Sequence, residues 1–239
     1  MVPDGGYEAD GETPSAARET RALPKTNHIV AAKIEGAEAS AAVLRLFVAI
    51  LLPDDVKNEI EKVQKEMRGA LPGNVVRWTK REQFHLTLKF LGNVAALRVA
   101  ELTEVLREAC RPLNALRLRA DRIGFFPDLR FPRVVWVGVH DERNDLPGLQ
   151  KAIETGARRF TDERAEKSFT GHVTLGRIQG IKRPQAEILS KLGLGMTGRF
   201  FGEWMTDQVE LIRSELSSSG SRYSTLAAFP LLGAHERSI

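Results

Sequence analysis

Two short segments of the sequence repeat one pattern of side chains. His85-Leu86-Thr87-Leu88 recurs 87 positions later as His172-Val173-Thr174-Leu175. Each segment holds an imidazole that titrates near neutral pH and a hydroxyl that can donate a hydrogen bond. Two imidazoles at one phosphate can take a proton from the attacking oxygen and give one to the leaving oxygen. Two hydroxyls can stabilise the charge on the non-bridging oxygens. The pair indicates phosphoryl chemistry without a metal.

The spacing within each segment fits a β-strand. Side chains two positions apart point to one face of a strand, so each histidine shares a face with its threonine while the aliphatic residues between them fill the other face. One such segment is a weak signal, since a single strand histidine is most often structural. Two similar copies favour function, because burying two imidazoles for packing alone costs desolvation. We expect the other three histidines, His28, His140 and His235, to be incidental.

The hydrophobic pattern around the two segments predicts an α+β fold of about nine strands and four helices. The predicted strands cover residues 45–52, 75–78, 83–91, 116–123, 134–139, 172–178, 199–204, 209–214 and 223–229, and the predicted helices cover 54–67, 94–110, 146–160 and 186–194. Two or more strands separate the helices, which argues against a regular parallel βαβ sheet. The repeat predicts two related lobes, each presenting one copy of the strand.

Length and composition narrow the class of protein. A chain of 239 residues suits one domain of ordinary size or two small lobes sharing a core. Cys110 is the single cysteine, which excludes an internal disulfide and a zinc ribbon and fits a reducing cytoplasm. No apolar run approaches the length of a membrane-spanning helix. The expected location is the cytoplasm, without membrane binding. We also expect a monomer that needs neither cofactor nor metal, although composition does not decide either point.

The first 42 residues differ from the rest of the chain. They show no sustained period of 2 or 3.6 and carry seven acids against four bases, whereas the remaining chain carries 31 bases and 24 acids. The pattern predicts a disordered N-terminal extension over 1–42 and a single two-lobed domain over 43–239. The basic body favours anionic partners such as nucleic acid.

Several further segments, taken in order, resemble the 2H phosphoesterase superfamily, and within it the RNA 2′,3′-cyclic phosphodiesterases, also called 2′-5′ RNA ligases. Besides both repeats, the similar segments are Arg45-Leu46-Phe47-Val48-Ala49-Ile50, Val76-Arg77-Trp78, Gly124-Phe125-Phe126-Pro127, Pro132–Val139, and the closing stretch at Ser214 and Arg222-Tyr223. The resemblance spans about residues 45–231. It implies a two-lobed fold with antiparallel sheets facing a central cleft and helices outside.

The resemblance also implies roles for individual residues. His85 would give a proton to the departing 3′ oxygen of an RNA 2′,3′-cyclic phosphate, and His172 would activate water. Thr87 and Thr174 would hold the phosphoryl oxygens. Arg177 would bind phosphate, although its odd spacing from Thr174 requires a twist or a bulge to bring it to the same face. Phe47 and Phe90 are our candidates for stacking on a base.

Four functions remain open on the sequence. The first is hydrolysis of a cyclic phosphate at an RNA end to a 2′-phosphomonoester. The second is the reverse reaction, which joins tRNA halves through a 2′-5′ linkage with the same two histidines. The third is a non-catalytic RNA-binding module, which both complete motifs disfavour. The fourth is hydrolysis of a related cyclic nucleotide or 2′-5′ oligoadenylate, which would differ in loops lining the base pocket.

Overall fold

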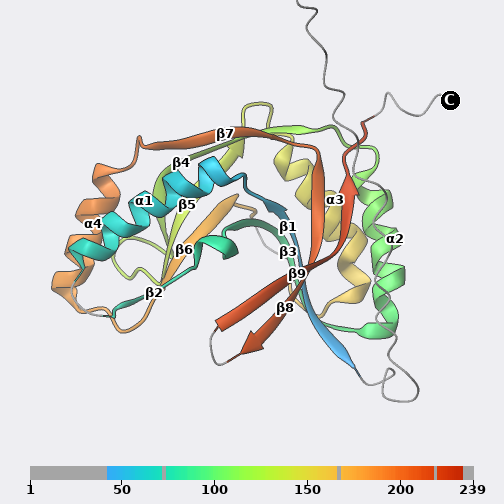
Figure 1. The fold of residues 1–239 in the computed structure, drawn as a ribbon, viewed down its shortest axis with the longest axis horizontal. Coiled ribbons are helices and arrows are strands. Elements are labelled where there is room, and N and C mark those ends of the chain that lie inside the picture. Colours follow the sequence, from blue (N-terminus) through green and yellow to red (C-terminus); the bar gives the residue numbers. More distant parts are fainter. Residues whose placement is uncertain (1–41, 72–73, 166–167, 218–219, 234–239) are drawn as a thin grey trace, which may run out of the picture. The chain divides into compact units, whose positions relative to one another are not determined.

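A computed structural model of the chain describes residues 42–71, 74–165, 168–217 and 220–233. The strands are β1 (Val43–Leu51), β2 (Val76–Trp78), β3 (His85–Ala95), β4 (Leu116–Phe126), β5 (Val134–Asp141), β6 (His172–Ile178), β7 (Phe200–Thr206), β8 (Gln208–Ser217) and β9 (Gly220–Pro230). They form one antiparallel sheet in the order β7-β4-β5-β6-β3-β1-β8-β9, and β2 pairs with β6 (Figure 1).

Four α-helices cover one face of this sheet. They are α1 (Asp54–Ala70), α2 (Val99–Cys110), α3 (Leu146–Ala157) and α4 (Arg183–Gly195), with single 3₁₀ turns at Arg81–Gln83, Ala96–Arg98 and Arg158–Phe160. Each α-helix contributes buried aliphatic side chains to one hydrophobic core, which also contains the inward-facing residues of the strands. The burial of this apolar face holds the helices against the sheet.

The strand order is symmetric about the contact between β6 and β3. On one side the order is β6, β5, β4, β7, and on the other it is β3, β1, β8, β9. Only one residue pair, Leu86 with Val173, joins β3 and β6. The two halves therefore meet edge to edge at the repeated segments, inside one continuous sheet rather than in two separate ones.

The helices are exchanged between these halves. Helix α1 follows β1 in the chain but packs against β7 and α4 of the other half. Helix α3 follows β5 but packs against β3 and α2 (Figure 1). Each half is thus covered by one helix that follows a strand of the other half in the chain. This exchange links the two halves across the contact between β3 and β6.

A buried carboxylate fixes the start of α3. Asp141, at the end of β5, accepts hydrogen bonds from the backbone N–H groups of Asp145 (2.7 Å) and Leu146 (3.0 Å). These N–H groups lie at a helix start, where no intrahelical acceptor exists, and the negative charge suits the helix dipole. The capping connects β5, which flanks the second motif, to a helix of the other half.

The predicted α+β class and antiparallel sheet are confirmed, and each predicted element is present. Several boundaries differ by three residues or more. The largest difference lies between the predicted strand 83–91 and the predicted helix 94–110, because β3 continues to Ala95 and α2 begins only at Val99. Gly92 adopts a left-handed φ of 67° opposite Leu46, next to an irregularity in the pairing with β1, and Val94 beyond it is buried and pairs with Leu44. The glycine lets the strand bend instead of ending it.

The predicted disordered extension over residues 1–42 lies outside the described residues, apart from Ala42, and stays a prediction. Of the helices that the structure describes, none has the length and apolar character needed to cross a membrane.

Candidate active site

Strands β3 and β6 bring the two repeated motifs side by side. Leu86 pairs with Val173 in an antiparallel ladder. Because this single pair lies between the two motifs, His85 and Thr87 flank it on β3, and His172 and Thr174 flank it on β6. The two imidazoles and two hydroxyls therefore gather around one point of the sheet, and His172 is close enough to lower the pKa of His85.

The two faces of the motifs differ as the sequence predicted. The aliphatic residues between and after the polar ones are buried in the main core: Leu86, Leu88, Val173 and Leu175. The four polar side chains are only half-buried: His85, Thr87, His172 and Thr174. We call the sheet face that carries these four residues the motif face. It lies opposite the helices.

The imidazole of His85 is held by a backbone carbonyl and two aromatic rings. Its Nδ1 lies 2.7 Å from the carbonyl oxygen of Gln83. Because a carbonyl only accepts, Nδ1 carries the proton, and Nε2 is left for proton exchange with a ligand. The ring lies 4.7 Å from that of Phe47 and 5.5 Å, edge-on, from that of Tyr223. These contacts fix both tautomer and orientation.

His172 is held in the same way. Its Nδ1 donates to the carbonyl oxygen of Thr170 at 2.8 Å, again two residues before the histidine. Phe126 packs edge-on against the imidazole at 5.0 Å, and the ring of Trp136 lies 6.2 Å away. Both histidines therefore present Nε2, the nitrogen that a proton-transfer pair must leave free.

Burial lowers the pKa of His85 from its ordinary value of 6.5 to about 4. The hydrogen bond to the carbonyl of Gln83 opposes this shift by favouring the protonated ring, and the nearby His172 adds a smaller lowering effect. At neutral pH the free protein therefore holds His85 mainly as a neutral imidazole.

A β-bulge brings Arg177 to the motif face. In the pairing of β5 with β6, Val135 lies opposite Gly176 and Trp136 lies opposite Thr174, so Leu175 is an extra residue on β6. An extra residue shifts the alternation of side chains by one position. Arg177 therefore follows Thr174 on the same face despite the odd spacing. The bulge supplies the irregularity that the sequence required for a phosphate contact.

The two candidate stacking residues lie on the motif face in different environments. Phe47 is 3% exposed and packs beneath His85, so it chiefly supports the imidazole. Phe90 lies opposite Phe47 in the ladder and is half-buried. The guanidinium of Arg45 lies over the ring of Phe90, 4.7 Å from its centroid. A base-stacking role stays a prediction for both phenylalanines, and Phe90 has the more accessible ring.

Tyr223, from β9, and Arg45 are site residues that the sequence reasoning did not single out. Burial raises the pKa of the Tyr223 hydroxyl, and a hydrogen bond from Ser221 together with the charges of Arg177 and Arg45 partly offsets that rise. Both arginines therefore lie near this phenol, which contacts His85. Arg45 lies two residues before Phe47 in β1 and so shares its face, which the spacing in the sequence could have shown. The position of Tyr223 instead depends on how the hairpin of β8 and β9 folds back.

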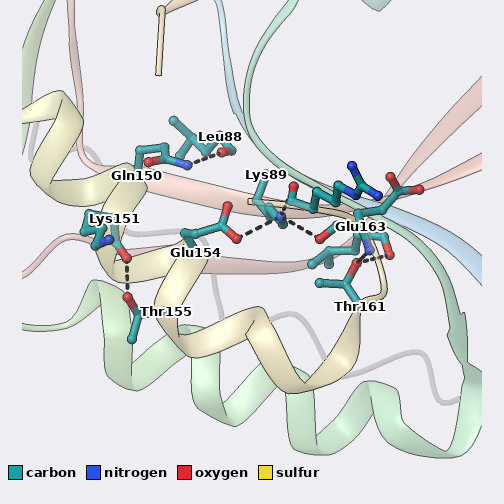
Figure 2. Close-up of polar contacts among 10 residues, drawn as sticks. Leu88, Lys89, Gln150, Lys151, Glu154, Thr155, Thr161 and Glu163 are labelled. Carbon is teal, nitrogen blue, oxygen red and sulfur yellow. Dashed lines mark hydrogen bonds and ion pairs between the residues drawn. The ribbon is translucent and has the colours of Figure 1, made fainter. Parts of the chain in front are cut away.

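Lys89 does not lie on the motif face, although it directly follows the first motif. An extra residue on β3 at Leu88 turns it toward α3, where it is 4% exposed. Its Nζ lies 2.9 Å from Oε1 of Glu154 and 3.3 Å from the carbonyl oxygen of Arg164. Figure 2 shows the pair, and beside it Gln150 donates to the carbonyl of Leu88 at 3.4 Å. These contacts anchor β3 to α3.

In the described parts of the chain, no group of three or more His, Cys, Asp or Glu side chains is arranged to hold a metal ion. The side chains on the motif face can transfer protons through two imidazoles, donate hydrogen bonds through two hydroxyls and balance negative charge through the guanidinium of Arg177. Such a set of groups suits phosphoester chemistry.

Comparison with known proteins identifies the family. A model of the LigT-like phosphoesterases matches residues 50–136, which contain the first motif. A curated relative from Aquifex aeolicus, named RNA 2′,3′-cyclic phosphodiesterase, is 30% identical over 192 residues, which are 80% of this chain and 99% of the relative. The chain belongs to the LigT-like phosphoesterase family of two-histidine enzymes.

Solved structures agree in fold. A protein from Thermus thermophilus superposes with a TM-score of 0.65 at 27% identity, covering 80% of this chain and all of the other. LigT of Escherichia coli, solved in complex with 3′-AMP, superposes with a TM-score of 0.63 at 25% identity, covering 80% of this chain and 99% of the other.

Proposed function

We propose that this protein is an RNA 2′,3′-cyclic phosphodiesterase, which hydrolyses the cyclic phosphate to a 2′-phosphomonoester without a metal. The observation that carries the proposal is the pairing of Leu86 with Val173, which sets two identically held imidazoles next to two hydroxyls. The curated relative from Aquifex aeolicus bears the name of this activity. The bound 3′-AMP in Escherichia coli LigT supports a nucleotide ligand for the family.

In the proposed reaction the histidines move two protons. Nε2 of His172 takes a proton from water as the water oxygen forms a bond to phosphorus. The bond between phosphorus and the 3′ oxygen breaks, and Nε2 of protonated His85 gives its proton to that oxygen. The product keeps the phosphate on the 2′ oxygen. Exchange with solvent then returns His172 to its neutral form and His85 to its protonated form.

The low pKa of His85 in the free protein makes substrate binding part of this cycle. A cyclic phosphate diester carries a negative charge, and an anion close to an imidazole favours its protonated form. Binding should therefore raise the pKa of His85 and load the donor with its proton. We infer that substrate affinity falls as the pH rises from about 4, the pKa of His85 in the free protein, towards the raised pKa in the complex, because binding takes up a proton over this range.

The hydroxyls and the cation complete the proposed site. Thr87 and Thr174 would donate hydrogen bonds to the non-bridging oxygens, and Arg177 would balance their charge. Phe90, with Arg45 above its ring, would face the base. All of these residues lie on the motif face, and the bulge at Leu175 is what brings Arg177 there.

The deciding experiment is incubation of the protein with a nucleoside 2′,3′-cyclic phosphate in EDTA, with the product isomer identified by phosphorus NMR. We expect only the 2′-phosphate. His85→Ala and His172→Ala should each lower kcat by about 10² to 10⁴ while the protein stays folded. His140→Ala is the matched control, since His140 lies on the neighbouring strand β5 and is 42% exposed. A 3′-phosphate product, or full activity in either motif variant, would overturn the proposal.

A further inference from the structure

Arg122 adopts a backbone conformation that arginine rarely takes. Its φ is 52°, in the left-handed region, and the one other described non-glycine residue with positive φ is Asn144, a type that tolerates it. Arg122 is the extra residue of a bulge in β4, since Asp121 pairs with Gly138 and Ile123 with Val137. Such outliers persist where the surrounding structure fixes them and are concentrated at functional sites.

The bulge sends the side chain of Arg122 across β5. A Cβ atom built on Gly138 would lie 3.0 Å from Nε and 3.2 Å from Cγ of Arg122, so the arginine occupies the space that any larger residue would fill. Gly138 lies directly opposite His172 in the ladder. Side chains of paired residues share a face. The Arg122 side chain therefore lies on the motif face, one strand away from His172.

Arg122 is exposed and has no ion-pair or hydrogen-bond partner for its guanidinium among the described residues. Other arginines of the same strand are paired: Arg117 with Glu203, and Arg119 with Asp121 at 3.2 Å. The carboxylate of Asp121 is also 3.6 Å from His140. The acid nearest in sequence to Arg122 is thus engaged elsewhere, which leaves this cation for an external anion.

We propose that Arg122 binds a backbone phosphodiester of the RNA chain, next to the cyclic phosphate held by the motifs. Guanidinium groups suit phosphate oxygens, and this one lies beside the reaction site but outside the set that would hold the cyclic phosphate. The inference rests on the proposed function and adds a substrate preference. A mononucleoside cyclic phosphate lacks an internal phosphodiester, so only an oligonucleotide would use Arg122.

The test compares a dinucleotide ending in a 2′,3′-cyclic phosphate with the corresponding mononucleoside cyclic phosphate. Arg122→Gln should raise KM for the dinucleotide about five- to ten-fold, as expected for one lost charged hydrogen bond, with kcat nearly unchanged. KM for the mononucleoside should not change. Arg183→Gln is the control, because the Arg183 side chain is 91% exposed on α4. Equal effects on both substrates, or no effect on either, would overturn the inference.

A binding measurement separates this inference from the proposed function. Fluorescence anisotropy with a labelled oligonucleotide that ends in a 2′-phosphate requires no turnover. Arg122→Gln should reduce the slope of log affinity against log salt by about 0.7, the value for one phosphate contact on a single strand. If the wild-type protein hydrolyses neither substrate, the proposed function fails, and this slope still tests Arg122. An unchanged slope rejects the contact.

The backbone strain at Arg122 provides a second variant. Arg122→Gly removes the guanidinium and also favours the left-handed conformation, so the variant should fold even if Arg122→Gln is strained. Asn144→Gly makes the same backbone change at the other described left-handed position, in the turn between β5 and α3. If Arg122→Gly weakens oligonucleotide binding and Asn144→Gly does not, the charge is responsible. Equal weakening by both would assign the effect to the backbone and overturn the contact.

Discussion

Leu88 in β3 and Leu175 in β6 are the extra residues of two β-bulges, and each directly follows the threonine of its motif. Lys89 and Thr87 flank the first bulge opposite consecutive residues of β1, and Gly176 and Thr174 flank the second opposite consecutive residues of β5. The sequence repeat therefore extends past the four residues of each motif, and it needs no inserted residue in the second copy.

The bulges also determine which residues correspond after each motif. In the sequence, a basic and an apolar residue follow each motif, Lys89-Phe90 directly and Arg177-Ile178 after Gly176. The bulges instead match Lys89 with Gly176, both turned from the motif face, and Phe90 with Arg177, both turned toward it. The two halves thus present different chemistry at one position, an aromatic ring in one half and a cation in the other.

The first prediction concerns Arg177. This arginine is exposed, so replacing it with glutamine should leave the melting temperature nearly unchanged. If it balances phosphoryl charge, Arg177→Gln should lower kcat/KM for a nucleoside 2′,3′-cyclic phosphate by about ten-fold or more. Arg111→Gln, at the end of α2, serves as the control for a lost surface charge. Kinetics equal to wild type would remove Arg177 from the site.

The second prediction concerns the two hydroxyls. Thr87→Val and Thr174→Val keep the branched shape but remove the donor. Each should lower kcat more than it lowers stability, by less than the roughly 2.7–4 kcal/mol that one donor supplies in a strong oxyanion site, because these side chains are half-buried. Rates and melting curves of both variants give the comparison. Unchanged turnover in both would show that the threonines are structural.

Much of this fold could be predicted from the sequence, because period-2 and helical patterns record which residues meet the core. The shared face of His85 and Thr87, and of His172 and Thr174, followed from alternation alone. The position of Arg177 did not, since a bulge is defined by the partner strand and leaves no mark on the bulged one. The same holds for Arg122, whose position depends on a bulge in β4 and on a glycine in β5.

Contacts between distant segments were the other part that the sequence could not provide. Periodicity predicted strands for both motifs but not that Leu86 would pair with Val173. It predicted the last hairpin but not that Tyr223 would reach His85. Strand order is decided by packing between segments far apart in the chain, and one sequence records only the faces that pack, not their partners.

The third prediction concerns the buried ion pair of Lys89 and Glu154, whose side chains are 3% and 14% exposed. Removing one partner leaves an uncompensated charge, so Lys89→Met or Glu154→Gln should each cost about 3–5 kcal/mol of unfolding free energy. The double variant should cost less than the sum, because it buries neither charge. Urea unfolding of the wild type, the two single variants and the double variant gives the four free energies of this double-mutant cycle. Additive losses would show that the pair is not coupled.

The last prediction follows from the lowered pKa of His85. In the unfolded chain this imidazole takes a proton near pH 6.5, whereas in the folded protein it does so only near pH 4. Between these values the unfolded state binds more protons, so the folded protein loses stability as the pH falls from about 6.5 to 4, and the contribution is fully present above 6.5. The loss should be at most about 3 kcal/mol, given the shift and the partial exposure of the ring.

His85→Asn removes the titrating group. As the pH falls through this range in a buffer without phosphate, the unfolding free energy of the wild type should therefore fall relative to that of the variant. His140→Asn should not change the profile in this way. Added phosphate, by favouring protonated His85, should move the loss of wild-type stability to lower pH or reduce it. A difference between wild type and His85→Asn that stays constant from pH 7.5 to 4 would show that His85 is not held neutral by its surroundings, and that a substrate is not needed to supply its proton.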